Sequence, residues 1–337
     1  MSGATAMQPK EHALSTNNGS RTVTWIQTSF NVIQALTVFI VMFVVMTLLF
    51  PTFHTYLNLT NLLKQQVPNL IVAIGMTFIL ISAEIDISVG GTMVLASVLT
   101  AKTMQAGGIY LGVLVGLGAG AGAGLVNGFL VAKGRIPSFI ATLGMMYMTR
   151  SIAYVVTRGF SVPVSTDFQK LFAANFHDIP YVVFFVILLY VIAFVILTRT
   201  IFGKQVYATG INIKAAELCG VPVVAVKMKC FVITGVLAGV AGIILVSRIG
   251  AVEPNLGTGF EFSVISAVVI GGTSLFGGVG NVFQSVLGVF IISLIKNGLN
   301  LGHVNLFWQD FVTGAVIVVA VLIDTWRKRI AEVLSLG

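Results

Sequence analysis

Long apolar runs separated by short polar segments dominate this chain. An apolar run extends from Ser29 to Phe50, close to the ~20 residues that a membrane-spanning helix needs. It is too long for the core of a cleavable signal peptide, so we expect this helix to remain in the mature protein. The pattern predicts an all-α polytopic membrane protein with about ten transmembrane helices, at 29–50, 67–83, 91–106, 108–132, 138–157, 181–198, 230–250, 261–276, 281–298 and 306–325.

Polar segments flank and interrupt this transmembrane domain. A polar tail covers 1–28, the spans and their loops cover 29–325, and a second tail covers 326–337. Lysine and arginine are retained on the cytoplasmic side of a membrane. With the N-terminus inside, the cytoplasmic segments hold 12 of the 19 lysines and arginines, against 6 in the outer segments. The bias predicts an N-in, C-in topology with the long 199–229 loop in the cytoplasm.

The composition excludes several classes of function. Hydrophobic residues make up 57% of the chain and charged residues only 9%, whereas soluble domains are about a quarter charged. The net charge of +8 reflects the topology, and no soluble basic domain is present to bind nucleic acid. Two cysteines and four scattered histidines indicate neither a disulfide framework nor a metal site. Neither a P-loop motif nor a hydrolase constellation occurs, so we expect no enzyme and no cofactor in this chain.

The 199–229 loop carries five cations and a single anion, Glu217. Its centre, 213–218, has the pattern of a short amphipathic helix. Asn212 can cap the start of this helix, because its side-chain oxygen can accept from the free N–H groups of the first turn. Gly220 can end it in a left-handed conformation, and Pro222 blocks continuation. A short, capped, basic helix between two spans predicts a contact surface for a soluble partner.

Two carboxylates lie at membrane depth in the segment "ISAEIDISVGGT". Glu84 and Asp86 must face protein, water or a partner, since a carboxylate exposed to lipid costs several kcal/mol. Gly90 and Gly91 follow and loosen the backbone. Either the segment is a structural turn that caps the third span, or it is a break between half-helices that serves as a gate or pathway.

Further polar residues lie inside the predicted spans. Arg150 is within the fifth span, and Asp310 enters the tenth at similar depth, so we expect the two to form a buried pair. Alternatively, Arg150 extends to the outer surface. The amides of Asn127, Asn297 and Gln309 either line a pathway for a hydroxyl-rich solute or join helices to one another.

The glycine-rich run Gly112–Gly128 contains G-x-G-x-x-G patterns, yet it does not fit a nucleotide-binding loop. No predicted strand precedes it, and no acidic residue follows at the required distance. Small residues in a span let helices approach closely. We interpret this run as a helix-packing surface.

The chain also contains a weak internal repeat. "ISVGGTMVL" (Ile87–Leu95) resembles "VVIGGTSLF" (Val268–Phe276), and an Asn-Gly pair follows each. Transporters often carry weak duplications of this kind. The alternative is chance recurrence among 36 glycines.

Several of these segments together resemble a known family. The loop core "ATGINIKAAELCGV" (Ala208–Val221) is similar to the cytoplasmic coupling loop of the permease subunits of bacterial monosaccharide ABC importers, of the ribose, arabinose, xylose and galactose type. "EIDISVGG", "PSFIATLGMMYMTR" and "AVVIGGTSLFGGVGN" resemble further motifs of these permeases, in the same order. The resemblance extends from about residue 57 to 325.

The resemblance implies a permease of the bacterial inner membrane that works as a homodimer or pair. Its partners would be a cytoplasmic ABC ATPase with fused nucleotide-binding domains, which binds the ATP and magnesium, and a periplasmic sugar-binding protein. The coupling helix would dock into the ATPase, and the residues implied in this coupling are Asn212, Lys214, Ala215, Ala216, Glu217 and Gly220.

One departure from the family bears on the solute and the gate. Ala83-Glu84 stands where glycines usually precede the Ile-Asp pair, which adds a carboxylate. Relatives carry pentoses, hexoses, an autoinducer-like furanose and nucleosides, and the sequence leaves this choice open. Two other classes also stay open, an ion-coupled secondary transporter that uses Glu84 and Asp86, and a non-transporting membrane scaffold.

Overall fold

A computed structural model describes residues 17–173, 175–176 and 179–335. Within these ranges the structure is almost entirely helical, as the apolar pattern predicted. The helices are α1 (Asn17–Leu49), α2 (Tyr56–Ile81), α3 (Val89–Gly128), α4 (Ser138–Thr157), α5 (Thr166–Ala173), α6 (Tyr181–Arg199), α7 (Ile201–Ile211), α8 (Ile213–Leu218), α9 (Val223–Ile249), α10 (Phe260–Ile270), α11 (Val282–Leu301) and α12 (Leu306–Ser335).

Helix α3 consists of two spans that fold back on each other. Gly108 has a left-handed φ of 82° and separates the two halves, and a π-helical turn, η1 (Phe129–Lys133), extends the second half. A Cβ atom on Gly112 would lie 2.7 Å from the carbonyl oxygen of Thr100, so the second half runs antiparallel along the first. This hairpin corresponds to the separate spans predicted at 91–106 and 108–132.

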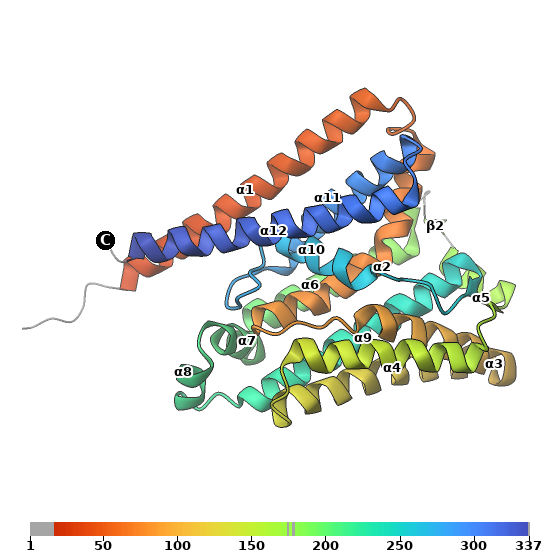
Figure 1. Ribbon diagram of the computed structural model, residues 1–337, viewed down its shortest axis with the longest axis horizontal. Coiled ribbons are helices and arrows are strands. Elements are labelled where there is room, and N and C mark those ends of the chain that lie inside the picture. Colours follow the sequence, from red (N-terminus) through yellow and green to blue (C-terminus); the bar gives the residue numbers. More distant parts are fainter. Residues whose placement is uncertain (1–16, 174, 177–178, 336–337) are drawn as a thin grey trace, which may run out of the picture.

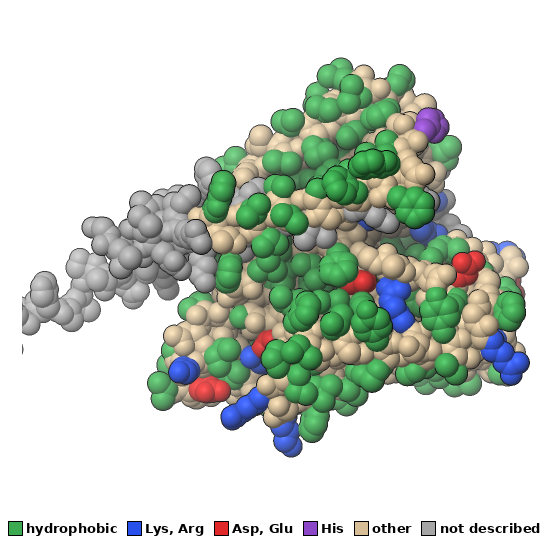
Figure 2. Space-filling view, in the orientation of Figure 1, with side chains coloured by type: hydrophobic (Ala, Val, Ile, Leu, Met, Phe, Trp, Pro, Cys, Tyr) green, Lys and Arg blue, Asp and Glu red, His purple; other side chains and the backbone are tan. Residues whose placement is uncertain are grey.

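Six helices in the described part of the chain are long and apolar enough to cross a membrane: α2, α3 with its π-helical turn, α4, α6, α9 and α11. Helix α10 is shorter, with 11 residues, and irregular segments precede and follow it. The protein is therefore an all-α, multi-pass membrane protein. Apolar side chains cover much of the face in Figure 2, and large ones such as Leu48 and Phe307 are exposed, as a lipid-facing surface requires.

Two boundaries differ from the sequence-based expectation. Helix α2 begins at Tyr56 and continues through Pro68, so it starts about three turns before the span predicted at 67–83. Helix α9 begins at Val223, well before the predicted start of that span at 230. Lys227 and Lys229 therefore belong to a helix rather than to the loop, because the apolar face of α9 extends beyond the membrane-like run.

Helices α3 and α9 share the most extensive contact among the described helices, and they approach each other closely. A Cβ atom on Gly120, Gly124 or Gly235 would overlap a backbone carbonyl of the opposite helix. Figure 1 shows α4 beside this pair in one layer, whereas α1 and α12 lie on the far side of α2. The glycine-rich run is thus a helix-packing surface, as its composition predicted.

The two ends of the helix bundle carry different structures. Figure 1 shows α7 and α8 at the end where α1 starts and α12 finishes, and α5 at the opposite end. Near α5, strand β1 (Val162–Pro163) pairs antiparallel with β4 (Ala251–Val252), and β2 (Asn175–Phe176) with β3 (Ile179–Pro180). Residues 200–222 thus form a compact structure at one end of the bundle.

Candidate gate and coupling site

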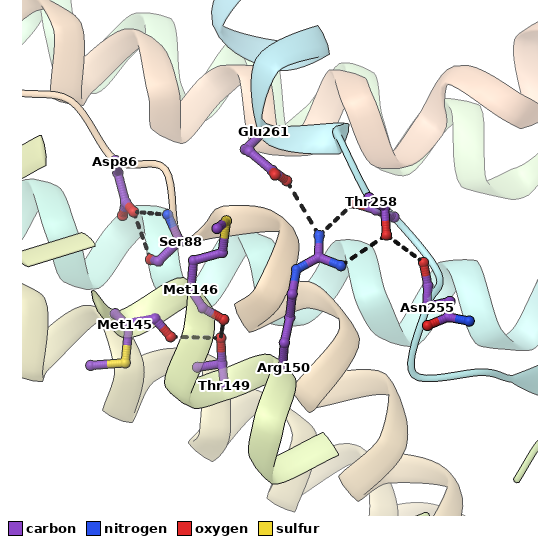
Figure 3. Close-up of polar contacts among 10 residues, drawn as sticks. Asp86, Ser88, Met145, Met146, Thr149, Arg150, Asn255, Thr258 and Glu261 are labelled. Carbon is purple, nitrogen blue, oxygen red and sulfur yellow. Dashed lines mark hydrogen bonds and ion pairs between the residues drawn. The ribbon is translucent and has the colours of Figure 1, made fainter. Parts of the chain in front are cut away.

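Residues 82–88, called here the α2–α3 break, interrupt the helical backbone between α2 and α3. Ala83 adopts a left-handed φ of 60°. Asp86 is buried, and its Oδ1 accepts hydrogen bonds from the backbone N–H of Ser88 at 2.8 Å and from the Ser88 hydroxyl at 2.6 Å (Figure 3). Asn127 Nδ2 donates to Ser88 Oγ at 2.8 Å. The structure therefore joins two predicted site residues, Asp86 and Asn127, through one serine.

Helix α4 holds this irregular backbone in place. The N–H of Ile85 donates to Ser138 Oγ at 3.2 Å, and the N–H of Ile87 donates to Thr142 Oγ1 at 3.1 Å. Backbone groups outside regular structure must find partners when they are buried. The hydroxyls of the "PSFIATLGMMYMTR" segment supply them, which gives that motif a structural role.

Arg150 projects from α4 toward the start of α10. Its Nη1 donates to Thr258 Oγ1 and its Nη2 to the carbonyl of Gly257, both at 3.0 Å. Nη2 also lies 3.6 Å from Oε2 of Glu261, and the exposed fractions of the two side chains are 15% and 4% (Figure 3). Arg150 is thus held within the protein, by an acid that sequence reasoning missed.

The expected partner of Arg150 was Asp310 on α12, whose side chain lies outside the described residues. The anion that the structure places beside the guanidinium is Glu261. Burial of a lone charge is costly, which is why an arginine at this depth needs an acid or several acceptors close by.

Two glycines bring α3 against this cluster. A Cβ atom on Gly90 would overlap the carboxylate of Glu261, and one on Gly91 would overlap the hydroxyl of Thr149. The first turn of α3 can therefore approach α10 and α4 only because these positions lack side chains. This close approach gives a physical reason for the paired glycines in the "EIDISVGG" segment.

Two buried polar atoms around the break, Thr92 Oγ1 and Asn127 Oδ1, have no hydrogen-bond partner among the residues that the structure describes. Unpaired buried polar atoms in a native protein indicate water or a ligand. Hydroxyl and amide oxygens of this kind are suited to hydrogen-bond a hydroxyl-rich solute.

Glu84 lies in the same break but turns toward a different helix. Its carboxylate forms a short ion pair with the ammonium group of Lys227 on α9. The exposed fractions of the two side chains are only 11% and 13%. Nothing in the sequence pattern indicates this pair, because Lys227 belongs to the 199–229 segment, which was expected to be a cytoplasmic loop.

Lys296 is another charged residue that the candidate-site prediction left out, and it lies within α11. Its Nζ atom donates to Ser263 Oγ on α10 at 2.9 Å. The signal that identifies both Glu261 and Lys296 is a single charged residue inside an otherwise apolar run, "FEFSVISAVVI" for Glu261 and "VFQSVLGVFIISLIKNGLNL" for Lys296. A charge in such a run is functional or paired by default.

The remaining predicted pathway residues bond elsewhere. Asn297 exchanges side-chain hydrogen bonds with Asn58 of α2 at 3.0 and 3.2 Å. Gln309 donates to Asn300 Oδ1 at 2.8 Å and to the Val304 carbonyl at 3.0 Å. These contacts join neighbouring helices, the alternative that the sequence left open, and they are not part of the hydrogen-bonded network around the break.

Helix α8 forms as its sequence predicted. Asn212 Oδ1 accepts from the N–H of Ala215 at 3.0 Å, and Gly220 has a left-handed φ of 79°. Ala216 is buried, while Lys214, Ala215 and Glu217 are exposed. The helix therefore presents a free face at the end of the bundle.

Comparison with known proteins gives the chain a family. Residues 58–321 match the family described as "Branched-chain amino acid transport system / permease component". The chain is 39% identical to the ribose import permease protein RbsC of Bacillus subtilis over 295 residues, 86% of this chain and 91% of the relative. It is 37% identical to RbsC of Escherichia coli K12 (88% and 94% covered) and 36% to the L-arabinose ABC transporter permease protein AraH of Azospirillum brasilense (87% of each).

No solved structure matches the chain. The family match covers both the α2–α3 break and α8, the two parts of the candidate site. The chain is more than 30% identical to each of these permeases over most of its length and theirs. This similarity confirms the family that the sequence motifs resembled. The protein is a transport component and not an enzyme, and it belongs to the permease family of ABC importers that includes the ribose and arabinose permeases.

Proposed function

We propose that this chain is the membrane-spanning permease subunit of an ATP-driven importer that carries a monosaccharide, a pentose or a hexose, across the bacterial inner membrane. The observation that carries the proposal is the similarity to ribose and arabinose import permeases over nearly the whole chain. The buried network of hydroxyl, amide and carboxylate groups around the break supports a hydroxyl-rich solute.

The proposal includes ten spans with both termini in the cytoplasm. Counting α3 as two spans, the long helices and α10 together make ten. The location of α8 at the same end as the start of α1 and the finish of α12 supports this topology (Figure 1), as does the excess of cations in those segments.

The proposed partners are a cytoplasmic ATPase with fused nucleotide-binding domains, which binds ATP and magnesium, and a periplasmic sugar-binding protein. A second permease chain completes the complex. The exposed face of α8, with Lys214, Ala215 and Glu217, would dock into the ATPase. The capped ends of α8 support this role, because they keep the short helix formed before the partner binds.

The alternative solutes are an autoinducer-like furanose or a nucleoside. An ion-coupled secondary transporter is less well supported, since the Glu84 carboxylate already has the ammonium group of Lys227 as its counterion. A coupling carboxylate must be free to take up a proton or sodium ion during each cycle.

The test is purification of the chain from its native membrane in mild detergent, followed by reconstitution into vesicles. Intact chain and a variant with residues 213–218 scrambled are compared. The proposal expects an ATPase with two nucleotide-binding domains to accompany only the intact chain, and ATP-dependent uptake of radiolabelled ribose or L-arabinose. Uptake by the permease alone, driven by an ion gradient, would overturn it.

A further inference from the structure

Helix α7, which precedes α8 in the chain, contacts the C-terminal end of α2. A Cβ atom on Gly210 of α7 would overlap the carbonyl of Ile81, the last residue of α2, and would lie 2.6 Å from the backbone nitrogen of Gly278. Gly278 in turn donates its N–H to the same Ile81 carbonyl at 2.9 Å. The three backbones meet at a point just before the α2–α3 break.

A second contact ties α7 to the same loop. The hydroxyl of Tyr207 donates to the carbonyl of Gly280 at 2.7 Å. Burial raises the pKa of Tyr207 to about 12, so the phenol keeps its proton and remains a donor. Helix α7 is therefore fixed to the loop between α10 and α11 at two places.

The C-terminal side of α8 reaches the break through α9. Helix α9 begins at Val223, and Lys227 lies about one turn later. Its ammonium group pairs with Glu84, which is next to Ala83, the residue with left-handed backbone in the break. Both side chains are nearly buried, so neither charge can turn to solvent without breaking the pair.

From Glu84 a short path leads to the polar network. Ile85 and Ile87 are hydrogen-bonded to α4, and Asp86 orients Ser88 at the start of α3. A displacement of Lys227 along α9 would therefore move a segment whose next residues hold the polar groups beside Asn127 and Glu261.

We propose that the Glu84–Lys227 ion pair is a positioning pair for energy coupling, which transmits movement of the α8 docking segment to the α2–α3 break. The inference rests on the proposed function, and it assigns to Glu84 a role other than contact with the solute. Contacts between backbones, as at Gly210, transmit pushing, whereas an ion pair also resists separation, so this pair lets α9 pull the break as well as push it.

Lys229 supplies a matched control. It is two residues from Lys227 on the same helix, it is exposed, and its ammonium group lies 5.7 Å from the centre of the Phe202 ring. Lys229→Met removes the same charge at nearly the same depth without touching Glu84. Any effect of general charge loss at this end of α9 should appear in both lysine variants.

The experiment uses the complete complex of permease, ATPase and binding protein in vesicles, and measures ATP hydrolysed and ribose or L-arabinose taken up. Four variants are compared with wild type: Lys227→Met, Lys229→Met, the neutral double variant Glu84→Gln/Lys227→Gln, and the exchanged pair Glu84→Lys/Lys227→Glu. The neutral double variant leaves no buried charge unpaired, so it tests coupling even where Lys227→Met does not accumulate in the membrane.

The expected result is a loss of at least about tenfold in sugar imported per ATP for the neutral double variant, with ATPase binding and hydrolysis retained. The exchanged pair should recover the wild-type ratio within about threefold, and Lys229→Met should match wild type. A wild-type ratio in the neutral double variant, or an equal loss in Lys229→Met, would overturn the inference. Failure of the proposed function would be separate, because wild type itself would then show no ATP-dependent uptake.

Discussion

Helix α8 and the α2–α3 break are connected through α9 and the Glu84–Lys227 ion pair, yet they are built in opposite ways. Helix α8 is held by its own sequence, through the Asn212 cap and the left-handed Gly220, and its outer face is exposed. The break is buried and is held by residues distant in sequence, such as Thr142, Asn127 and Lys227. The segment proposed to dock a partner is thus stabilised locally, whereas the segment proposed to move depends on contacts with neighbouring helices.

This difference predicts that substitutions near the break destabilise the whole permease, while those at α8 leave its stability unchanged and affect only docking. The measured quantity is the free energy of unfolding of the purified permease in detergent, together with ATPase binding. The expected losses of stability are largest at Arg150, smaller at Thr142 and Asn212, and absent at Ala215.

Arg150→Leu should have the largest effect. It leaves the buried carboxylate of Glu261 without its counterion, and breaking a buried pair in this way costs about 3–5 kcal/mol. The double variant Arg150→Leu/Glu261→Leu should recover most of this loss in the same unfolding measurement. Lys170→Ala is the exposed control, since its pair with Asp167 is solvated and contributes only about 0.5 kcal/mol. Equal losses in Arg150→Leu and the control would contradict the assignment.

Thr142→Val should have an intermediate effect. The substitution preserves shape but removes the acceptor for the N–H of Ile87, and an unsatisfied buried donor costs about 1–3 kcal/mol. Thr198→Val on α6 is the control, because that hydroxyl is exposed and bonds only to the carbonyl of Phe194 in its own helix. If both variants unfold at the same denaturant concentration, α4 does not support the break through Thr142.

Asn212→Ala should have a smaller and local effect. Loss of the cap destabilises α8 by about 1 kcal/mol. Hydrogen exchange at the amides of residues 213–218 should become faster, with no change in global unfolding. Asn212→Ser retains a capping oxygen and should keep the slow exchange. Faster exchange in both variants would show that α8 is held by something other than its cap.

Ala215→Glu should have no measurable effect on unfolding, since its side chain is exposed. At the proposed docking face it should nevertheless reduce binding of the ATPase at least about tenfold, because the added carboxylate must be desolvated on docking. Glu217→Lys tests the same face. Lys170→Glu, a charge change at the other end of the molecule, should bind the ATPase normally. Normal binding of the ATPase by both α8 variants would mean that the docking surface lies elsewhere.

The same difference separates the features that were predicted from the sequence from those that were not. Sequence reasoning predicted the apolar spans, among them the two at 91–106 and 108–132, the glycine packing surface and the bounds of α8. Each of these depends on residues close together in the chain. It missed the contact of Glu261 with Arg150, the ion pair of Lys227 and the hydrogen bond of Lys296, each of which joins residues on two different elements.

The sequence alone determined that this protein is a multi-pass helical membrane protein with a short capped helix between two spans, because hydrophobicity, capping and glycine content act over a few residues. Only the tertiary structure decided which buried charge meets which. Arg150 pairs with Glu261 at the start of α10, and Glu84 pairs with Lys227 on α9. The free energy of a buried charge depends on the partner that the fold places beside it, and that partner is distant in the sequence.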